Sequence, residues 1–167
     1  MAFLGPFALG ALALASNDPA ARRTALEEAE ALLGAGAVSH NHLLFPRDAV
    51  EAYLEAEDWD GVERTAAEME EYTRREPLPF AAFYTARARA LAERGRGRPD
   101  PAALDRLRDE AERLGILVAL PGIEAAINEP RASFRRRGNS PAVSPAIPLQ
   151  DAENSAASRA STTGSTN

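Results

Sequence analysis

The chain has 167 residues and a formal net charge of −6, with 19 basic residues against 25 acidic ones. All of the basic residues are arginine, and the sequence contains neither lysine nor cysteine. Without lysine, P-loop nucleotide binding and Schiff-base chemistry are excluded, because both require an amine at a defined position. Without cysteine, disulfides, thiolate nucleophiles and cysteine-based zinc sites are excluded as well.

Charge divides the chain into two parts. Residues 1–128 carry 14 arginines against 22 acidic residues, whereas residues 129–167 carry five against three. An acidic body repels phosphate backbones and anionic lipid surfaces, so we expect neither nucleic acid nor membrane as a partner. A body of about 125 residues is long enough to bury a core as a single domain.

The chain opens with an apolar run, MAFLGPFALGALALAS, that carries no charge. It is shorter than the roughly 20 residues of a membrane-spanning helix. It ends in small residues, as a signal peptide does, but no basic residue precedes Arg22. We therefore interpret residues 3–15 as a buried first helix.

Two further helix starts carry a capping aspartate. Asp18-Pro19 and Asp100-Pro101 combine a side-chain cap with proline at the first helical position, and Asp58-Trp59-Asp60-Gly61 opens another helix. Between them, VSHNHLLFPRD at 38–48 connects to the third helix, with Ser39 or Asn41 as its cap. The second helix is expected to end at Gly34, and the third is expected to run to about Glu57. The fourth should open at 58–61 and end at 75–80, and the others are expected at about 79–94, 101–114 and 118–128.

One apolar signature occurs three times, as GALALA at 10–15, AVEAYLEA at 49–56 and RARALAE at 87–93. The steps between matching residues are 39 and 38 residues. A period of about 34–47 residues is typical of helical solenoids, whose units bury their apolar faces by stacking. The sequence predicts an all-α fold over 1–128, with about three tetratricopeptide-like helical hairpin repeats and a C-terminal capping helix in a right-handed α-solenoid. Such a scaffold favours protein or peptide binding over catalysis.

Residues 129–167 are rich in serine, proline and alanine, and they show no periodicity. This composition cannot bury enough apolar area to offset the entropy of ordering, so we predict a disordered tail. Within it, RASFRRRG at 131–138 is either an arginine-rich contact with a kinase-type site at Ser133 or an unselected run.

His40 and His42 are the only histidines, and Asp48 follows closely, which suggests a metal or acid–base site. Histidines at i and i+2 do not share a helix face. In the alternative interpretation, one caps a helix or bonds a backbone carbonyl and the other is solvated. Together with Asn41 and Arg47, these residues are the candidate binding residues, and no cofactor is expected.

Paired carboxylates such as Glu70-Glu71 lie on the polar sides of the expected helices, which is typical of solvated faces with ion pairs one turn apart. Six aromatic residues are candidates for a ligand groove, but their helical spacing is more typical of a core between helices. We expect Trp59 in the corner between the two helices of the second pair. The six are Tyr53, Trp59, Tyr72, Phe80, Phe83 and Tyr84.

Three sequence words are distinctive: VSHN at 38–41, the Asp58-Trp59 turn and EPLPF at 76–80. With them, the stretch from about Phe3 to Ile127 resembles the tetratricopeptide-like C-terminal region of large bacterial adenylate/guanylate cyclases that carry an AAA-type ATPase module. The resemblance implies a cytoplasmic signalling protein whose repeats bind partners or regulate upstream cyclase and ATPase domains. This chain has no Gly-x-x-x-x-Gly-Lys motif and no cyclase-like strand block with metal-binding aspartates, so no catalytic residue can be carried over.

Three hypotheses follow. The first is a non-catalytic helical-repeat module for protein binding or regulation. The second is a small helical metal-binding or hydrolytic protein that uses His40, His42 and Asp48. The third is a truncated fragment without independent activity.

Overall fold

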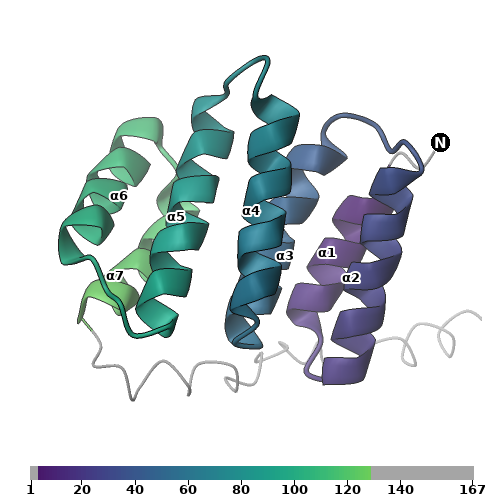
Figure 1. Cartoon of the computed structure of the whole chain (residues 1–167), viewed down its shortest axis with the longest axis horizontal. Coiled ribbons are helices and arrows are strands. Elements are labelled where there is room, and N and C mark those ends of the chain that lie inside the picture. Colours follow the sequence, from purple (N-terminus) through teal and green to yellow (C-terminus); the bar gives the residue numbers. More distant parts are fainter. Residues whose placement is uncertain (1–3, 129–167) are drawn as a thin grey trace, which may run out of the picture.

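The computed structural model describes residues 4–128, which form seven α-helices, one short 3₁₀ helix and no strand (Figure 1). The predicted tail at 129–167, with its arginine-rich segment, lies outside the described residues. The elements are α1 Gly5–Ala15, α2 Pro19–Gly34, α3 Asn41–Glu55, α4 Trp59–Thr73, α5 Pro79–Gly95, α6 Pro101–Leu114, η1 Leu117–Ala119 and α7 Leu120–Asn128.

The helices succeed one another along the long axis of the molecule, with α1 and α2 at one end and α6 and α7 at the other (Figure 1). Helix α1 packs on α2 and α3, α4 packs on α3 and α5, and α7 packs mainly on α6. The all-α prediction is therefore confirmed, and the packing is compatible with a helical repeat. The handedness of the predicted solenoid remains a prediction.

An aspartate caps the second helix of each pair, as predicted for Asp18 and Asp100. The side chains of Asp18, Asp58 and Asp100 accept hydrogen bonds from the backbone N–H groups of Ala20, Gly61 and Ala103 at 3.0, 2.9 and 3.1 Å. Each bond satisfies a donor that has no partner within its helix. These caps lie at the turns of the three helix pairs and recur about 40 residues apart.

Most of the segment at 38–48, which the sequence predicts as the connection to the third helix, is itself helical, and α3 begins at Asn41. Pro46 lies inside this helix and is buried there. The N-cap residue of α3 is His40, which makes no capping side-chain hydrogen bond. Neither Ser39 nor Asn41 therefore caps α3, and Asn41 is instead its first residue.

Two adjoining clusters of buried side chains form the core. The larger one runs from α1 through α4 to α5 and includes Phe45, Val62 and Leu91. The second lies around α5, α6 and α7 and includes Phe83, Leu107 and Ile123. None of the helices within residues 4–128 is long and apolar enough to cross a bilayer.

Trp59, at the start of α4, contacts α5. It is partly buried, and its ring lies so close to Gly95 that a Cβ atom there would approach the ring to 2.3 Å. The ring thus packs on the last residue of α5 and joins the second hairpin to the third.

Candidate functional site

The five candidate residues lie at the start of α3, but their side chains contact different neighbours. Asn41 is fully buried, and its Oδ1 accepts a hydrogen bond from the backbone N–H of Phe7 at 3.2 Å. Its Nδ2 donates to the carbonyl of Val38, also at 3.2 Å. Because Phe7 is in the first turn of α1, Asn41 satisfies an N–H donor that α1 leaves without an intrahelical partner. Asn41 is therefore a structural residue.

The ring of His42 stacks on the ring of Tyr72 in α4, with centroids 4.4 Å apart and an interplanar angle of 7°. Burial lowers the pKa of His42, and a hydrogen bond to the backbone of Ala37 partly offsets this effect. The folded protein thus favours the neutral form of the His42 ring. This agrees with its position between α3 and α4.

The structure does not assemble the metal site considered for His40, His42 and Asp48. Within residues 4–128, no group of three or more histidine, aspartate or glutamate side chains lies together as a metal ion would require. His42 faces Tyr72, whereas Asp48 is bonded to Arg47. These two side chains therefore belong to separate contacts.

Arg47 and Asp48 do lie together in a polar cluster. The Nε of Arg47 donates to Oδ1 of Asp48 at 2.7 Å, and this bond raises the pKa of the guanidinium. The side chain of Asp48 is 8% exposed, whereas that of Arg47 is 32% exposed. The buried carboxylate thus fixes a guanidinium whose outer edge reaches the surface.

One helical turn further along α3, Glu51 pairs with Arg87 of α5. Both terminal nitrogens of Arg87 face the carboxylate, and its Nη2 lies 3.4 Å from Oε2 of Glu51. The side chain of Arg87 is 5% exposed and that of Glu51 is 33% exposed. As at Arg47 and Asp48, one member of the pair is buried and the other reaches the surface.

Helix α7 packs against the side chain of Arg87. A Cβ atom at Gly122 would lie 2.6 Å from Nη2 of Arg87, so the guanidinium packs closely against the backbone of α7 there. The Nε of Arg87 is buried and has no hydrogen-bond partner among the described residues. Arg87 thus occupies a tight space among α3, α5 and α7.

Tyr84 lies beside both pairs. Burial raises the pKa of its hydroxyl, the positive charges of Arg47 and Arg87 oppose this effect, and Glu51 and Asp48 reinforce it. We call the set the α3–α5 polar cluster; it comprises Arg47, Asp48, Glu51, Tyr84 and Arg87. Its two positive and two negative charges balance.

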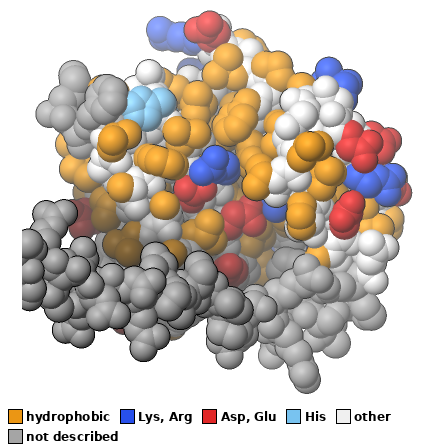
Figure 2. Space-filling model, turned by 180° about the vertical axis from the view of Figure 1, so that it is seen from behind, with side chains coloured by type: hydrophobic (Ala, Val, Ile, Leu, Met, Phe, Trp, Pro, Cys, Tyr) orange, Lys and Arg blue, Asp and Glu red, His pale blue; other side chains and the backbone are white. Residues whose placement is uncertain are grey.

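Figure 2 shows the side of the molecule opposite to that in Figure 1. Helices α1, α3 and α7, which lie behind in Figure 1, are in front here. Charged side chains of both signs lie in the middle of this face, and hydrophobic side chains surround them (Figure 2). Leu43 and Phe80 lie one turn before Arg47 and Tyr84 on their helices, and both are partly exposed. The face therefore combines apolar contact area with a small, well-held polar centre.

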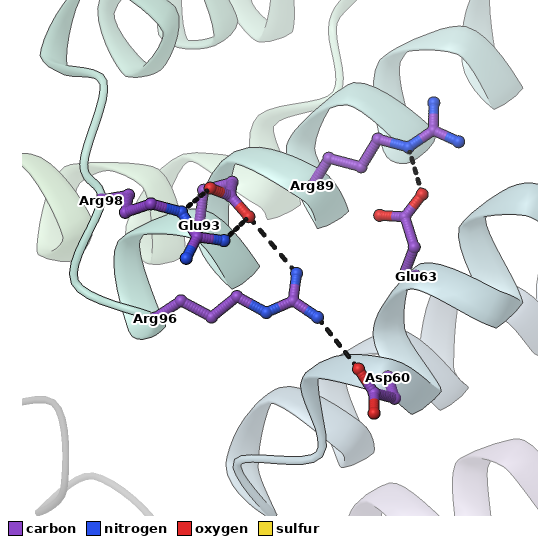
Figure 3. Close-up of polar contacts among 6 residues, drawn as sticks. All are labelled: Asp60, Glu63, Arg89, Glu93, Arg96 and Arg98. Carbon is purple, nitrogen blue, oxygen red and sulfur yellow. Dashed lines mark hydrogen bonds and ion pairs between the residues drawn. The ribbon is translucent and has the colours of Figure 1, made fainter.

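The ion pairs around α4 and the C-terminal part of α5 are more exposed than those of the α3–α5 polar cluster (Figure 3). Nε of Arg89 lies 2.9 Å from Glu63, and Arg96 bridges Asp60 at 3.1 Å and Glu93 at 3.3 Å. These carboxylates are all at least 41% exposed, so each pair contributes little on its own. Glu71 likewise pairs with Arg74 at the surface, at 2.8 Å.

Two surface grooves of about 340 and 370 Å³ lie elsewhere. The first lies between α4 and α5, where Thr73, Leu78 and Arg89 line it. The second lies where Pro99 and Leu104 face Ile127 of α7. Neither groove includes a residue of the α3–α5 polar cluster.

Most of the aromatic side chains belong to the core or to contacts between helices. Tyr53, Phe83 and Tyr84 are buried, whereas Tyr72 is 43% exposed and stacks on His42. The interpretation as inter-helix packing therefore describes this set better than a ligand groove does.

Comparison of the chain with protein-family models, with curated proteins and with solved structures gave no match. Sequence reasoning singles out Arg47 and Asp48 and includes Tyr84 among the aromatic candidates, but it misses Glu51 and Arg87. A signal for Arg87 was present in the stretch YTARARALA. There Arg87 is three residues after Tyr84 and four before Leu91, on the apolar side of the helix. An arginine on a buried face requires a partner from another helix.

Proposed function

We propose that this chain is a non-catalytic helical-repeat module that binds a protein or peptide on the face that carries the α3–α5 polar cluster. The observation that supports it is the buried arginine, Arg87, held between α3, α5 and α7 with a single acidic partner. Burying an ion pair costs desolvation free energy that an apolar side chain of similar volume avoids. We therefore assign this pair to recognition of a ligand and not to stability alone.

The surroundings of the cluster support a macromolecular ligand. Arg47 and Glu51 present charged ends that are about one-third exposed, while their partners Asp48 and Arg87 are buried and hold them in place. Protein interfaces combine such positioned polar groups with an apolar contact area. The partly exposed Leu43 and Phe80 supply that area here.

The sequence resemblance suggests the biological setting. We propose that the module regulates, or recruits partners to, a bacterial signalling protein of the cyclase and AAA-type ATPase kind. Upstream domains of such a protein are then candidate partners, in the cytoplasm. No nucleotide chemistry is assigned to the module itself.

A charge reversal tests the binding face. Peptides selected from a displayed random library on the immobilised chain should bind Arg47→Glu at least about tenfold more weakly, because the new carboxylate faces Asp48 and Glu51. Arg106→Glu is the matched control: Arg106 lies on α6, is 71% exposed and is remote in sequence from the cluster. Fluorescence anisotropy gives both affinities. Equal affinity for the two variants, or ATP turnover by the purified chain, would contradict the proposal.

A further inference from the structure

The α3–α5 polar cluster holds more hydrogen-bond donors than it uses. An arginine side chain carries five N–H donors in a planar fork. Nε of Arg47 donates to Asp48, but neither terminal nitrogen of Arg47 makes a hydrogen bond to another residue within 4–128. Because this side chain is 32% exposed, the unused donors lie on the edge of the guanidinium that reaches the surface.

The hydroxyl of Tyr84 is a further donor without a partner. The residue is only 7% exposed, and its hydroxyl makes no hydrogen bond in the described part of the chain. By contrast, Tyr53 is 8% exposed and donates to Glu30 at 2.7 Å. A buried tyrosine hydroxyl usually has a partner, because a buried polar group without one costs free energy. The hydroxyl of Tyr84 is thus left for an acceptor from outside this part of the chain.

The two carboxylates of the cluster are already engaged. Asp48 accepts from Nε of Arg47 at 2.7 Å, and both terminal nitrogens of Arg87 face Glu51. The cluster therefore has donors left over and lacks acceptor oxygens, so a ligand that fits it supplies acceptors. The two parallel N–H groups on one edge of a guanidinium match the two oxygens of a carboxylate.

Arg89 shows that one arginine of this chain can hold two carboxylates. Its Nε donates to Glu63 at 2.9 Å, while its Nη2 donates to Glu70 at 2.8 Å. Arg47 makes the first of these contacts, with Asp48, and lacks the second. A carboxylate from a ligand completes the same arrangement at Arg47.

We propose that Arg47 and Tyr84 bind an aspartate or glutamate side chain of the peptide ligand. This inference rests on the proposed function and adds the chemical group that the face recognises. The acidic residue lies inside the peptide and not at its end. Hydrophobic side chains surround the charged centre of the face (Figure 2), so peptide residues on both sides of the carboxylate can cover them.

Synthetic variants of a peptide selected on the chain test the carboxylate. Each aspartate or glutamate of the peptide is replaced singly by its amide, and one further variant has an amidated C-terminus. One internal replacement should weaken binding to the wild-type chain at least about tenfold. The same replacement should change binding to Arg47→Gln less than about twofold, because the fork is already lost there. Sensitivity to C-terminal amidation alone, or an equal effect of the replacement on both chains, would overturn the inference.

Removal of one hydroxyl tests Tyr84. Tyr84→Phe should weaken binding of the acidic peptide about three- to tenfold and should not alter binding of the amide variant. Tyr72→Phe is the matched control, because Tyr72 lies on α4 outside the cluster, and it should bind both peptides as the wild type does. Circular dichroism verifies that both variants are folded. Wild-type affinity of Tyr84→Phe for the acidic peptide would contradict the assignment of Tyr84.

The peptide measurements separate two kinds of failure. If Arg47→Gln binds every selected peptide as tightly as the wild type does, the proposed binding face is wrong, and the carboxylate assignment falls with it. If Arg47→Gln binds weakly although no internal carboxylate of the peptide matters, the face is right and the carboxylate assignment alone is wrong.

Discussion

Two buried arginines of α5 join the third repeat to the last helix. Arg87 lies under Gly122, and Nε of Arg94 donates to the carbonyl of Ala126 at 2.6 Å. Both contacts use the planar guanidinium, whose several fixed donors suit confined positions better than an ammonium group does. The same side chains that hold α7 in place thus also shape the face that carries the α3–α5 polar cluster.

Glu57 adopts a left-handed backbone conformation, with φ of 56°, just after α3. The N–H groups of Glu57 and Asp58 donate to the carbonyls of Leu54 and Tyr53, as in a Schellman motif. Gly97 has the same role after α5. We expect Glu57→Gly to raise the free energy of unfolding by about 1 kcal/mol, because glycine adopts this conformation without strain.

Urea denaturation measures this change. The control is Gly97→Ala, which should lower stability by about 1 kcal/mol because alanine disfavours a positive φ. A loss of stability in Glu57→Gly would show that the glutamate side chain contributes more than the strain costs.

Gly61 in α4 lies against α3. A Cβ atom there would approach the ring of Tyr53 to 2.6 Å and the carboxylate of Asp58 to 2.8 Å. We expect Gly61→Ala to cost about 1–3 kcal/mol through overpacking. Thermal unfolding measures the loss. In Gly34→Ala nothing lies within 4 Å of the new atom, so that variant should be at least as stable as the wild type. Equal behaviour of the two variants would contradict the close contact between α3 and α4.

At the scale of the elements, the stacked rings of His42 and Tyr72 join α3 to α4. Burial lowers the pKa of His42 from its ordinary value of 6.5, so the unfolded chain binds a proton more readily than the folded one. Stability should therefore fall as the pH drops below 6.5 towards the lowered pKa, and should not depend on this group at higher pH.

Unfolding free energies measured across this pH range test the assignment. His42→Phe keeps an aromatic ring but removes the titration, so its stability should depend less on pH than that of the wild type. Tyr72→Phe keeps both the histidine and the stacked ring, so its pH dependence should resemble the wild-type one. An unchanged pH dependence in His42→Phe would assign the effect to another group.

Helix starts were predictable where a local rule determines them. Asp18, Asp58 and Asp100 each precede a helix whose free N–H they accept, and this pattern is visible in the sequence. The start of α3 was not predictable in the same way. Asn41 has a residue type that commonly caps its own helix. Its side chain instead accepts a hydrogen bond from Phe7 in the first turn of α1, 34 residues away in the sequence.

The same distinction applies to the candidate site. Arg47 and Asp48 are neighbours on one helix, so a sequence pattern could find them. Glu51 and Arg87 meet only because α3 packs beside α5, and the room for Arg87 depends on Gly122 of α7. Neither the pair nor its position at a surface follows from local spacing.

At the scale of the whole molecule, α3 and α7, which contact Arg87, lie behind α4 and α5 in the view of Figure 1. Helix α1 lies at one end of the stack, and η1, which contacts α6 and α7, lies near the other.

Amide hydrogen exchange, with and without a peptide selected on the chain, tests the central claim most directly. If the proposed face binds the ligand, protection should increase in the parts of α3 and α5 around Arg47, Glu51 and Tyr84, and at the start of α7. The amides of α2 and of α6 should exchange as before. Protection confined to α2 or α6, with none in α3 and α5, would contradict the account.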